Sequence, residues 1–388
     1  MLRSLYCDRM AFDVAVVGAG IVGCSVAWRL QREGASVVVV ERGEVGAEAS
    51  WAGGGQLVPE AAREGAPGPL LDHWLAALRM YPEYVAAVRE ESGAQLELKQ
   101  GGRLRIASDE GEVAALRAHF EAQKPNGVRA EWWEADQVRA AEPALAEPGA
   151  EQPPVLAAIH FPDHGFVENR RLVPALAQTI ARRGGVVRTH APVARLVAEG
   201  SRARGVELLG GERIAAGAVV NAAGAWASQV VPATTVPVGP SKGQMAALEV
   251  RPMPLERIVS FAGVTFVPRA DGRMLLAATK ENDVGYDKRP TLWAMEHLLA
   301  GAMRHLPQLR QATLAETWAG LRPRAEDDLP VVGRDDLEGL YWATGHYSMG
   351  ILSAPATAEA LAGLVLRGRS PLPIDAFSPK RFAGAPAR

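Results

Sequence analysis

The chain has 388 residues, so we expect one large or two interleaved domains, and its 48% hydrophobic residues are ordinary for a soluble globular protein. The 42 basic and 44 acidic residues give a formal net charge of -2, which provides no general attraction to nucleic acid or to an anionic membrane. Only two cysteines occur, and no cluster of cysteine and histidine has metal-ligand spacing, which argues against a disulfide framework and a metal site and fits a cytoplasmic protein.

The first predicted elements form a βαβ unit that follows a short N-terminal extension. Residues 1–11 contain no long apolar stretch, so we expect a flexible extension and not a signal peptide. Phe12–Val17 is typical of a buried strand, and the sequence Gly18-Ala19-Gly20-Ile21-Val22-Gly23 opens a helix that extends to about Arg32. Ser36–Val40 is a second apolar strand with Glu41 at its end. Such a unit predicts a parallel sheet.

Helices and strands alternate along the remainder of the chain. Ala49–Leu57 is rich in glycine and alanine and is predicted as a loop. Apolar periodicity predicts helices near Leu70–Glu91, Glu110–Gln123, Asn169–Arg183, Thr291–His305 and Ile351–Leu366. Strand-like runs occur at Val186–Thr189, Val193–Ala198, Gly205–Leu209, Ala218–Val220 and Leu340–Ala343, and Val236–Thr279 is rich in strands. No segment reaches about 18 uninterrupted apolar residues, so we expect no transmembrane helix.

The glycines of the first turn have the spacing of a dinucleotide-binding motif. Gly18 allows the tight turn from strand to helix, Gly20 lets the backbone approach a pyrophosphate, and Gly23 lets the helix pack against the strand. The N–H groups at the start of the helix are donors for phosphate oxygens. Glu41 stands roughly where an acid accepts hydrogen bonds from ribose hydroxyls. This pattern predicts dinucleotide binding over a glycine turn of another kind, and it leaves NAD and FAD open.

Four segments carry a resemblance that extends over almost the whole chain after residue 12. They are Asp13–Gly23 with Glu41-Arg42-Gly43, the loop Ala49–Leu57, the stretch Val219–Ser228, and Trp318-Ala319-Gly320-Leu321-Arg322-Pro323 with Ala343-Thr344-Gly345-His346 and Gly350–Pro355. In these segments the chain resembles the D-amino-acid-oxidase-type family of FAD-dependent oxidoreductases, and within it the glycine oxidases.

The resemblance implies an α/β fold with two domains. The first is a Rossmann-like FAD-binding domain with a mixed or parallel sheet, and the second is a β-rich α+β substrate-binding domain. We expect the FAD-binding domain at residues 12–85, 160–235 and 318–370, and the substrate domain at residues 86–159 and 236–317.

FAD is the cofactor that the resemblance implies, held without a covalent link. Some members of the wider family attach FAD through a histidine near the first glycine loop or a cysteine near the C-terminus. Here Ser50-Trp51-Ala52 contains no histidine and no cysteine follows Cys24, which excludes attachment at those places. The cofactor-binding residues that the resemblance implies are Gly18, Gly20, Ile21, Val22, Gly23, Glu41, Arg42, Ser50, Ala52, Gly53, Gly54, Gln56, Leu57, Val193, Ala223, Gly224, Trp226, Arg322, His346, Met349, Gly350, Ile351 and Leu352.

Arg322 is the predicted anchor for a substrate carboxylate, because a guanidinium matches a carboxylate with two parallel hydrogen bonds. In the resembled family the arginine of the Gly-Leu-Arg-Pro motif has this role, whereas an ion-paired surface arginine is the plain alternative. The helix after Gly350 can direct its positive N-terminal end toward the flavin. His346 is predicted to contact substrate or flavin, and a structural histidine is an equal alternative. Arg322 and His346 are the predicted catalytic residues.

Four further residues are predicted to contact the substrate: Thr265, Lys280, Tyr347 and Ser348. Glycine oxidase patterns usually carry arginine and asparagine where Ser348 and Met349 stand, and often a tyrosine at the place of Thr265. These departures put glycine itself in doubt as the substrate. Lys280 is either a second cation for a substrate with another carboxylate or an ordinary surface lysine.

The predicted function is FAD-dependent oxidative deamination of a small amino acid or amine. A hydride passes from the α-carbon to flavin N5, the imine is hydrolysed, and dioxygen or another electron acceptor reoxidises the flavin, with hydrogen peroxide as the expected product of the oxidase. The alternatives are a D-amino-acid dehydrogenase with a quinone or carrier acceptor, a sarcosine-type secondary-amine oxidase, and a non-catalytic flavin-binding module. In the glycine oxidase family the imine can serve thiamine thiazole synthesis. Relatives are often homo-oligomers, and the sequence gives no decisive interface signal.

Overall fold

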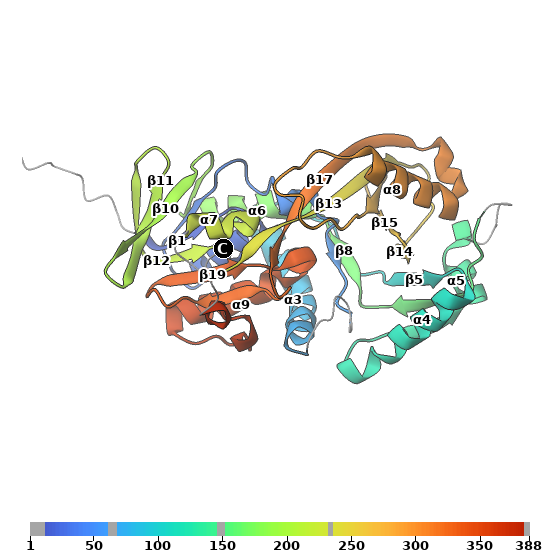
Figure 1. Cartoon of the computed structure of the whole chain (residues 1–388), viewed down its shortest axis with the longest axis horizontal. Coiled ribbons are helices and arrows are strands. Elements are labelled where there is room, and N and C mark those ends of the chain that lie inside the picture. Colours follow the sequence, from blue (N-terminus) through green and yellow to red (C-terminus); the bar gives the residue numbers. More distant parts are fainter. Residues whose placement is uncertain (1–11, 61–67, 146–151, 232–235, 384–388) are drawn as a thin grey trace, which may run out of the picture.

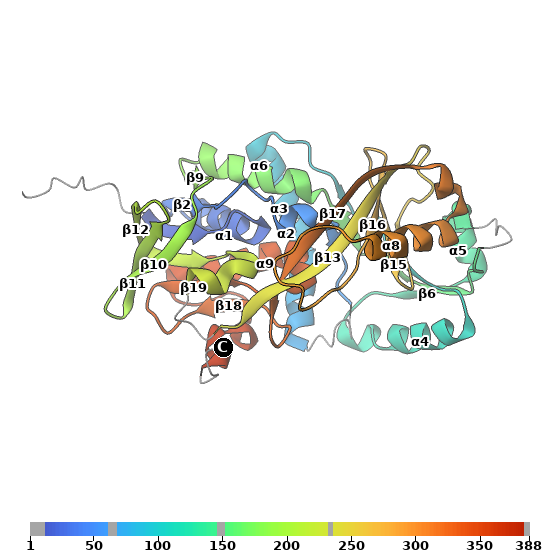
Figure 2. The same cartoon turned by 45° about the horizontal axis from the view of Figure 1, so that its top comes forward.

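Two large β-sheets organise residues 12–60, 68–145, 152–231 and 236–383, which are the part of the chain that the computed structural model describes. Figure 1 shows the two sheets side by side in an elongated molecule. Strands β13 (Val238–Glu249) and β17 (Thr313–Ala325) pair antiparallel and run from one half of the molecule into the other (Figure 2). The predicted extension at residues 1–11 lies outside the described residues.

The first sheet contains the predicted βαβ unit at its centre. Its parallel strands follow the order β9, β2, β1, β12 and β19, and antiparallel pairs extend it. The four valines of β2 are all buried, as the β-branched run predicts. The strands are β1 (Phe12–Val17), β2 (Val37–Val40), β9 (Val186–Arg188), β10 (Val193–Glu199), β11 (Arg202–Leu208), β12 (Arg213–Asn221), β18 (Val331–Arg334) and β19 (Leu340–Thr344).

The second sheet is mostly antiparallel and has the strand order β17-β13-β16-β15-β14-β5-β7-β6. Its remaining strands are β5 (Arg103–Ala107), β6 (Glu131–Glu134), β7 (Ala157–Phe161), β14 (Ile258–Phe261), β15 (Val264–Pro268) and β16 (Arg273–Ala277). A small third sheet joins β3 (Gln56–Leu57), β8 (Gly165–Val167) and β4 (Leu98–Lys99). The mixed sheets and the β-rich second unit confirm the predicted α/β fold class.

Helices cover both units. They are α1 (Ile21–Arg32), α2 (Ala49–Ala52), α3 (Gly68–Ser92), α4 (Glu110–Glu121), α5 (Ala135–Ala141), α6 (Asn169–Arg182), α7 (Ala227–Val230), α8 (Leu292–His305) and α9 (Gly350–Arg367). The long predicted helices are confirmed with ends within a few residues. The loop predicted at Ala49–Leu57 is wrong in detail, because this segment forms α2 and then β3, each held by partners distant in sequence.

Helix α9 is the most apolar helix that the structure describes, and it packs on α1 and α3. The segment Tyr347–Arg367, which contains α9, is long and apolar enough to cross a membrane, but 67% of its apolar 18-residue window is buried inside the fold, as in a core helix. Pro355 lies inside α9 and has no N–H, so the carbonyl of Ile351 lacks its helical donor. The hydroxyl of Tyr81, on α3, donates to that carbonyl instead.

The division of the chain into two domains stays a prediction. The first sheet takes its strands from residues 12–40, 186–221 and 331–344, and the second takes its strands from residues 103–161 and 238–325. The sequence predicts residues 318–325 for the FAD-binding domain, whereas the whole of β17 is hydrogen-bonded into the second sheet.

Candidate functional site

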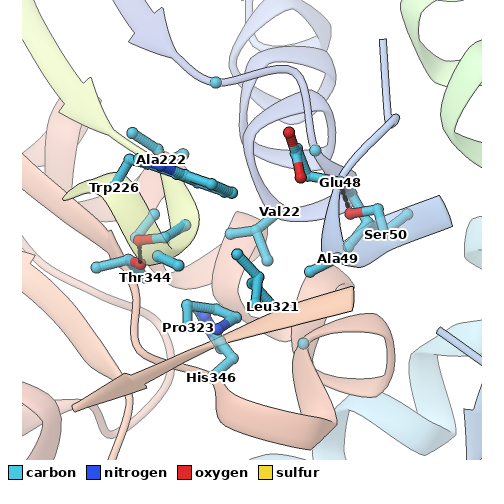
Figure 3. Close-up of a pocket in the computed structure, with 18 of the residues that line it drawn as sticks. Val22, Glu48, Ala49, Ser50, Ala222, Trp226, Leu321, Pro323, Thr344 and His346 are labelled. Carbon is cyan, nitrogen blue, oxygen red and sulfur yellow. Dashed lines mark hydrogen bonds between the residues drawn. The ribbon is translucent and has the colours of Figure 1, made fainter. Parts of the chain in front are cut away.

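A cavity of about 340 Å³ opens at the carboxyl ends of β1 and β2. This edge of a parallel sheet is where ligands bind in open α/β folds. Figure 3 shows side chains from the helix α1, from α2, from β17 and from the segment before α9 that surround one space. The residues that line this first cavity are Val17, Gly18, Gly20, Ile21, Val22, Val40, Glu41, Arg42, Glu48, Ala49, Ser50, Gly53, Pro192, Val193, Ala222, Ala223, Gly224, Ala225, Trp226, Gln229, Val230, Leu321, Arg322, Pro323, Ala343, Thr344, His346, Tyr347, Ser348, Gly350 and Ile351.

The glycine turn leaves no room for side chains. Gly18 has φ +104°, and a Cβ atom there would lie 2.5 Å from the carbonyl oxygen of Ala222. A Cβ atom at Gly23 would lie 2.0 Å from the carbonyl oxygen of Gly18, so helix and strand touch at this point. The backbone at the start of α1 therefore forms one wall of the cavity. The N–H of Ile21 in this first turn donates to Oγ of Ser50 at 2.8 Å.

The carboxylate of Glu41 is fixed at the rim of the first cavity. Its Oε2 accepts from the N–H of Ala19 at 2.8 Å, and its Oε1 accepts from the N–H of Gly43 at 2.9 Å. Each carboxylate oxygen can accept a second hydrogen bond. Beside it, the guanidinium of Arg42 lies over the ring of Trp226, with its carbon 3.5 Å from the ring centroid, and forms an ion pair with Glu48.

Side chains of three residues distant in sequence hold the backbone of the segment from Ala49 to Gln56. This segment lies between the first cavity and a second one. The Nδ2 of Asn169 donates to the carbonyls of Ser50 and Gly53. The indole N–H of Trp318 donates to the carbonyl of Ala52 at 2.9 Å, and Arg269 donates to the carbonyl of Gly54 at 2.6 Å.

A second cavity of about 360 Å³ lies on the other side of this segment, against the face of the second sheet. The two cavities share the lining residues Ala49, Gly53, Arg322, Tyr347, Ser348 and Ile351. The other residues that line the second cavity are Ala52, Gly54, Gly55, Gln56, Val58, Arg103, Gly243, Met245, Phe261, Gly263, Val264, Thr265, Ala277, Ala278, Thr279, Lys280, Gly320 and Met349. A molecule in one cavity can therefore contact a molecule in the other at the shared wall.

Arg322 is the charged residue of this shared wall. Its Nη1 donates to the carbonyl of Lys242 at 3.0 Å, and its Nη2 donates to the carbonyl of Thr279 at 2.9 Å. These two backbone carbonyls fix the plane of the guanidinium. The guanidinium is thus held in one orientation at a position that lines both cavities.

Tyr347, which lines both cavities, has an unusual backbone conformation. Its φ is +48°, in the left-handed region that a bulky residue rarely adopts. Its hydroxyl is buried, without a hydrogen-bond partner among the described residues. The ammonium of Lys280 is 4.8 Å from the centroid of the Tyr347 ring. Strained backbone and an unpaired buried hydroxyl are features that concentrate where proteins bind ligands.

His346 is buried, and a residue of helix α9 holds its ring in place. Its Nε2 pairs with Oγ1 of Thr357 at 3.0 Å, and Nε2 of His73 pairs with the same hydroxyl at 3.2 Å. Burial, and then the neighbouring His73, lower the pKa of His346 to about 3, so its ring is neutral at ordinary pH. The ring therefore supplies shape and position near the first turn of α9, and no positive charge.

The structure brings nearly all of the predicted site residues to the two cavities. Gly23, Leu57 and Leu352 line neither cavity and are packing residues beside them. Thr265, Lys280, Gln56, Ala52, Gly54 and Met349 line the second cavity, and the remaining predicted residues line the first. The sequence did not single out Glu48, Ala49, Pro192, Gln229, Pro323 and Thr344 in the first cavity, nor Arg103, Met245, Phe261 and Thr279 in the second.

These features fit a flavin dinucleotide. The glycine turn is free of side chains where a pyrophosphate needs backbone, and the Glu41 carboxylate lies where ribose hydroxyls need an acceptor. The buried Tyr347 hydroxyl, at the wall between the cavities, has no hydrogen-bond partner in the part of the chain that the structure describes.

The chain matches a known family and individual proteins over most of its length. The family model described as FAD dependent oxidoreductase matches residues 13–364. The glycine oxidase of Pseudomonas putida is 34% identical over 368 residues, which cover 94% of this chain and 96% of that protein. The bifunctional protein ThiO/ThiG of Synechocystis sp. is 33% identical over 95% of this chain, and the chain spans only 54% of its length.

Solved structures agree with these matches. The glycine oxidase of Geobacillus kaustophilus superposes with a TM-score of 0.88 at 28% identity, covering 96% of this chain and 99% of that one. The iminodiacetate oxidase of Chelativorans sp. superposes with a TM-score of 0.83 at 26% identity, covering 94% of this chain and 98% of that one.

Proposed function

The chain belongs to the family of FAD-dependent oxidoreductases and acts on amino-type donors, and from this we propose that it catalyses the oxidative deamination of a small amino acid. The observation that carries the proposal is the wall shared by the two cavities, with Arg322 and Tyr347 exposed to both. The first cavity takes FAD, and the second takes the amine. The names of the relatives, glycine oxidase and iminodiacetate oxidase, support a carbon–nitrogen bond next to a carboxylate as the bond that is oxidised.

When bound, FAD would supply the oxidising chemistry: it would take a hydride from the α-carbon of the substrate, water would hydrolyse the resulting imine to an oxoacid and ammonia, and dioxygen would accept the two electrons to give hydrogen peroxide. The protein's task is to position the substrate. Arg322 binds the substrate carboxylate with a planar guanidinium that its bonds to the carbonyls of Lys242 and Thr279 hold in place. Holding the carboxylate and the amine in one orientation removes most of the entropic barrier to the transfer.

The surroundings of the first cavity also favour negative charge on the cofactor. Helix α9 begins at Gly350, which lines the first cavity, so the positive end of its dipole lies at this cavity. His346 stays neutral and is a positioning residue in this proposal, because its Nε2 pairs with Thr357. The proposed roles of Glu41 and of the turn at Gly18 and Gly20 are to hold the ribose and the pyrophosphate.

The test is an anaerobic titration of the purified holoenzyme with glycine, sarcosine and D-amino acids while the flavin absorbance is recorded. We expect bleaching by at least one of these amines, and hydrogen peroxide in equal amount to the oxoacid when air is admitted. A flavin that no amine reduces would contradict the proposal. Bleaching without peroxide would keep amine oxidation and replace dioxygen by a quinone or a carrier as the acceptor.

A further inference from the structure

The second cavity is lined by three cationic side chains and by no acidic one among the residues that the structure describes. The cations are Arg103, Lys280 and Arg322. Binding one carboxylate needs only one of them. A small cavity that gathers three positive side chains attracts a ligand with more than one negative group.

Arg103 is the least expected of the three, because it is buried. Its side chain is only 7% exposed. It comes from β5, which is distant in the strand order of the second sheet from β17, the strand of Arg322. Its Nε and Nη2 donate to Oγ of Ser260 at 3.1 and 3.0 Å. Oγ of Ser260 is 2.9 Å from Oγ1 of Thr265, which also lines the cavity. The guanidinium is therefore fixed beside Thr265 at the distal end of the cavity.

Arg103 belongs to a buried ion-pair cluster. Glu60, fully buried, forms ion pairs with both Arg103 and Arg105. Arg105 is 43% exposed and does not line the second cavity, whereas Arg103 does. Of the two guanidinium groups, Arg103 is therefore the one that a ligand in the cavity would contact.

The register of the sheet relates the partners of the two arginine groups. Ser260 pairs with Thr265, and Thr265 pairs with Ala277, so the partner of Arg103 is two strands away from the strand that leads to Thr279, the partner of Arg322. Two strand spacings put the backbones of Ser260 and Ala277 on the order of 10 Å apart. A separation of this order fits a ligand whose two carboxylates are joined by a chain of a few atoms.

We propose that the substrate is an amino acid with a second carboxylate, and that Arg103 is the residue that selects for it. The α-carboxylate binds Arg322 and the distal carboxylate binds Arg103 with Thr265. Lys280, beside Tyr347, adds positive potential to the same cavity. This inference rests on the proposed function, because it assigns the amine to the second cavity.

The first experiment measures binding without turnover. Succinate and glutarate have two carboxylates and no amine, and propionate and butyrate are their counterparts with one. Each is titrated into the oxidised holoenzyme while the shift of the flavin spectrum is followed. We expect the dicarboxylates to bind at least tenfold more tightly than the monocarboxylates. Equal affinities would overturn the proposal.

Variants test which residue produces the preference for dicarboxylates. Arg103→Lys keeps a buried charge for Glu60 but loses the planar fork, and Arg103→Gln removes the charge. Both should reduce the dicarboxylate preference to about twofold or less. Arg105→Gln is the matched control, because it removes a guanidinium from the same Glu60 cluster but not from the cavity. A preference that survives in both Arg103 variants would overturn the proposal, and Arg103→Lys alone suffices if Arg103→Gln does not fold.

A comparison of substrates distinguishes this inference from the proposed function. Glycine, D-alanine, D-aspartate, D-glutamate and iminodiacetate are compared by the rate of anaerobic flavin reduction. Faster reduction by a dicarboxylic amine supports both proposals. Equal or faster reduction by glycine and D-alanine contradicts the dicarboxylate inference and leaves amine oxidation intact. No reduction by any of the five contradicts the proposed function as well.

Discussion

A Cβ atom at Gly243 would lie 2.2 Å from Nη2 of Arg322, so the guanidinium of Arg322 lies directly against the backbone of the neighbouring strand. Only glycine allows this approach without displacing the side chain. The strand β13 thus decides where the carboxylate anchor lies, although it contributes no side chain at that point.

Gly243→Ala should displace the guanidinium and raise KM for the substrate by roughly 10-fold, with smaller loss of kcat, because a misplaced anchor weakens binding first. Gly239→Ala on the same strand is the control, since a Cβ atom there meets nothing within 4 Å. Steady-state kinetics of both variants check this. Unchanged kinetics of Gly243→Ala would contradict the position proposed for the anchor.

Arg322→Lys should lower kcat/KM by about 10- to 100-fold, because an ammonium cannot make the two parallel hydrogen bonds of a guanidinium to a carboxylate. Flavin content and Tm are the accompanying measurements, to separate substrate binding from folding. Arg195 is an exposed arginine of β10 that pairs with Glu207 of β11, and Arg195→Lys should behave as the unaltered protein. A small effect at residue 322, similar to that at residue 195, would remove Arg322 from substrate binding.

Gly23→Ala should lower both the flavin content and Tm. The new Cβ atom would lie 2.0 Å from the carbonyl oxygen of Gly18, and neither backbone segment can move without opening the turn. Overpacking of this kind costs about 1–3 kcal/mol. Gly301→Ala in α8 is the helical control, because its Cβ atom would make an ordinary contact at 3.4 Å with Val264. The prediction fails if both variants retain full flavin.

Tyr347→Phe should weaken binding without weakening the fold. The hydroxyl has no partner among the described residues, so its removal breaks no bond in the protein and should change the free energy of unfolding of the apoprotein by less than about 0.5 kcal/mol. Affinity for flavin or for substrate should fall by roughly 10-fold. Tyr81→Phe is the contrast, because it leaves the Ile351 carbonyl without a donor and should cost about 1–3 kcal/mol of stability.

Acid should destabilise the protein through its buried histidines. Burial lowers the pKa of His73 to about 4 and that of His346 to about 3. As the pH falls below about 6.5, the unfolded chain binds protons at these residues before the folded protein does, so acid favours unfolding, by about 1 kcal/mol per pH unit for each histidine. Urea unfolding of His73→Asn at pH 7, 6 and 5 should show a shallower loss. A slope identical to that of the wild-type chain would contradict the assignment.

Local motifs predicted many of the residues that line the first cavity, and the reason is physical. The turn at Gly18 and the end of β2 at Glu41 belong to one continuous βαβ unit, so their spacing in sequence fixes their spacing in the fold. Arg322 was also predictable, because it lies inside a segment with a family resemblance.

Two parts of the site could not be predicted in the same way: the residues that hold the segment after Ala49, and Arg103 at the distal end of the second cavity. The segment after Ala49 is held by Asn169, Arg269 and Trp318, which lie more than 100 residues away in the chain. The approach of Arg103 to the second cavity depends on the parallel pairing of β5 with β14. Neither pairing leaves a trace in a single sequence, because a buried arginine next to an apolar strand also fits an ordinary ion pair.

Strand β17 contacts the wall between the two cavities through Trp318 and lines both cavities through Arg322, while β14, β15 and β16 line only the second cavity. Substitutions on those three strands can alter which amine is accepted while the turn after β1 stays unchanged. Evolution can therefore change the amine that such an enzyme accepts without changing the residues of the first cavity. Laboratory selection for a new amine should accumulate its mutations on these three strands.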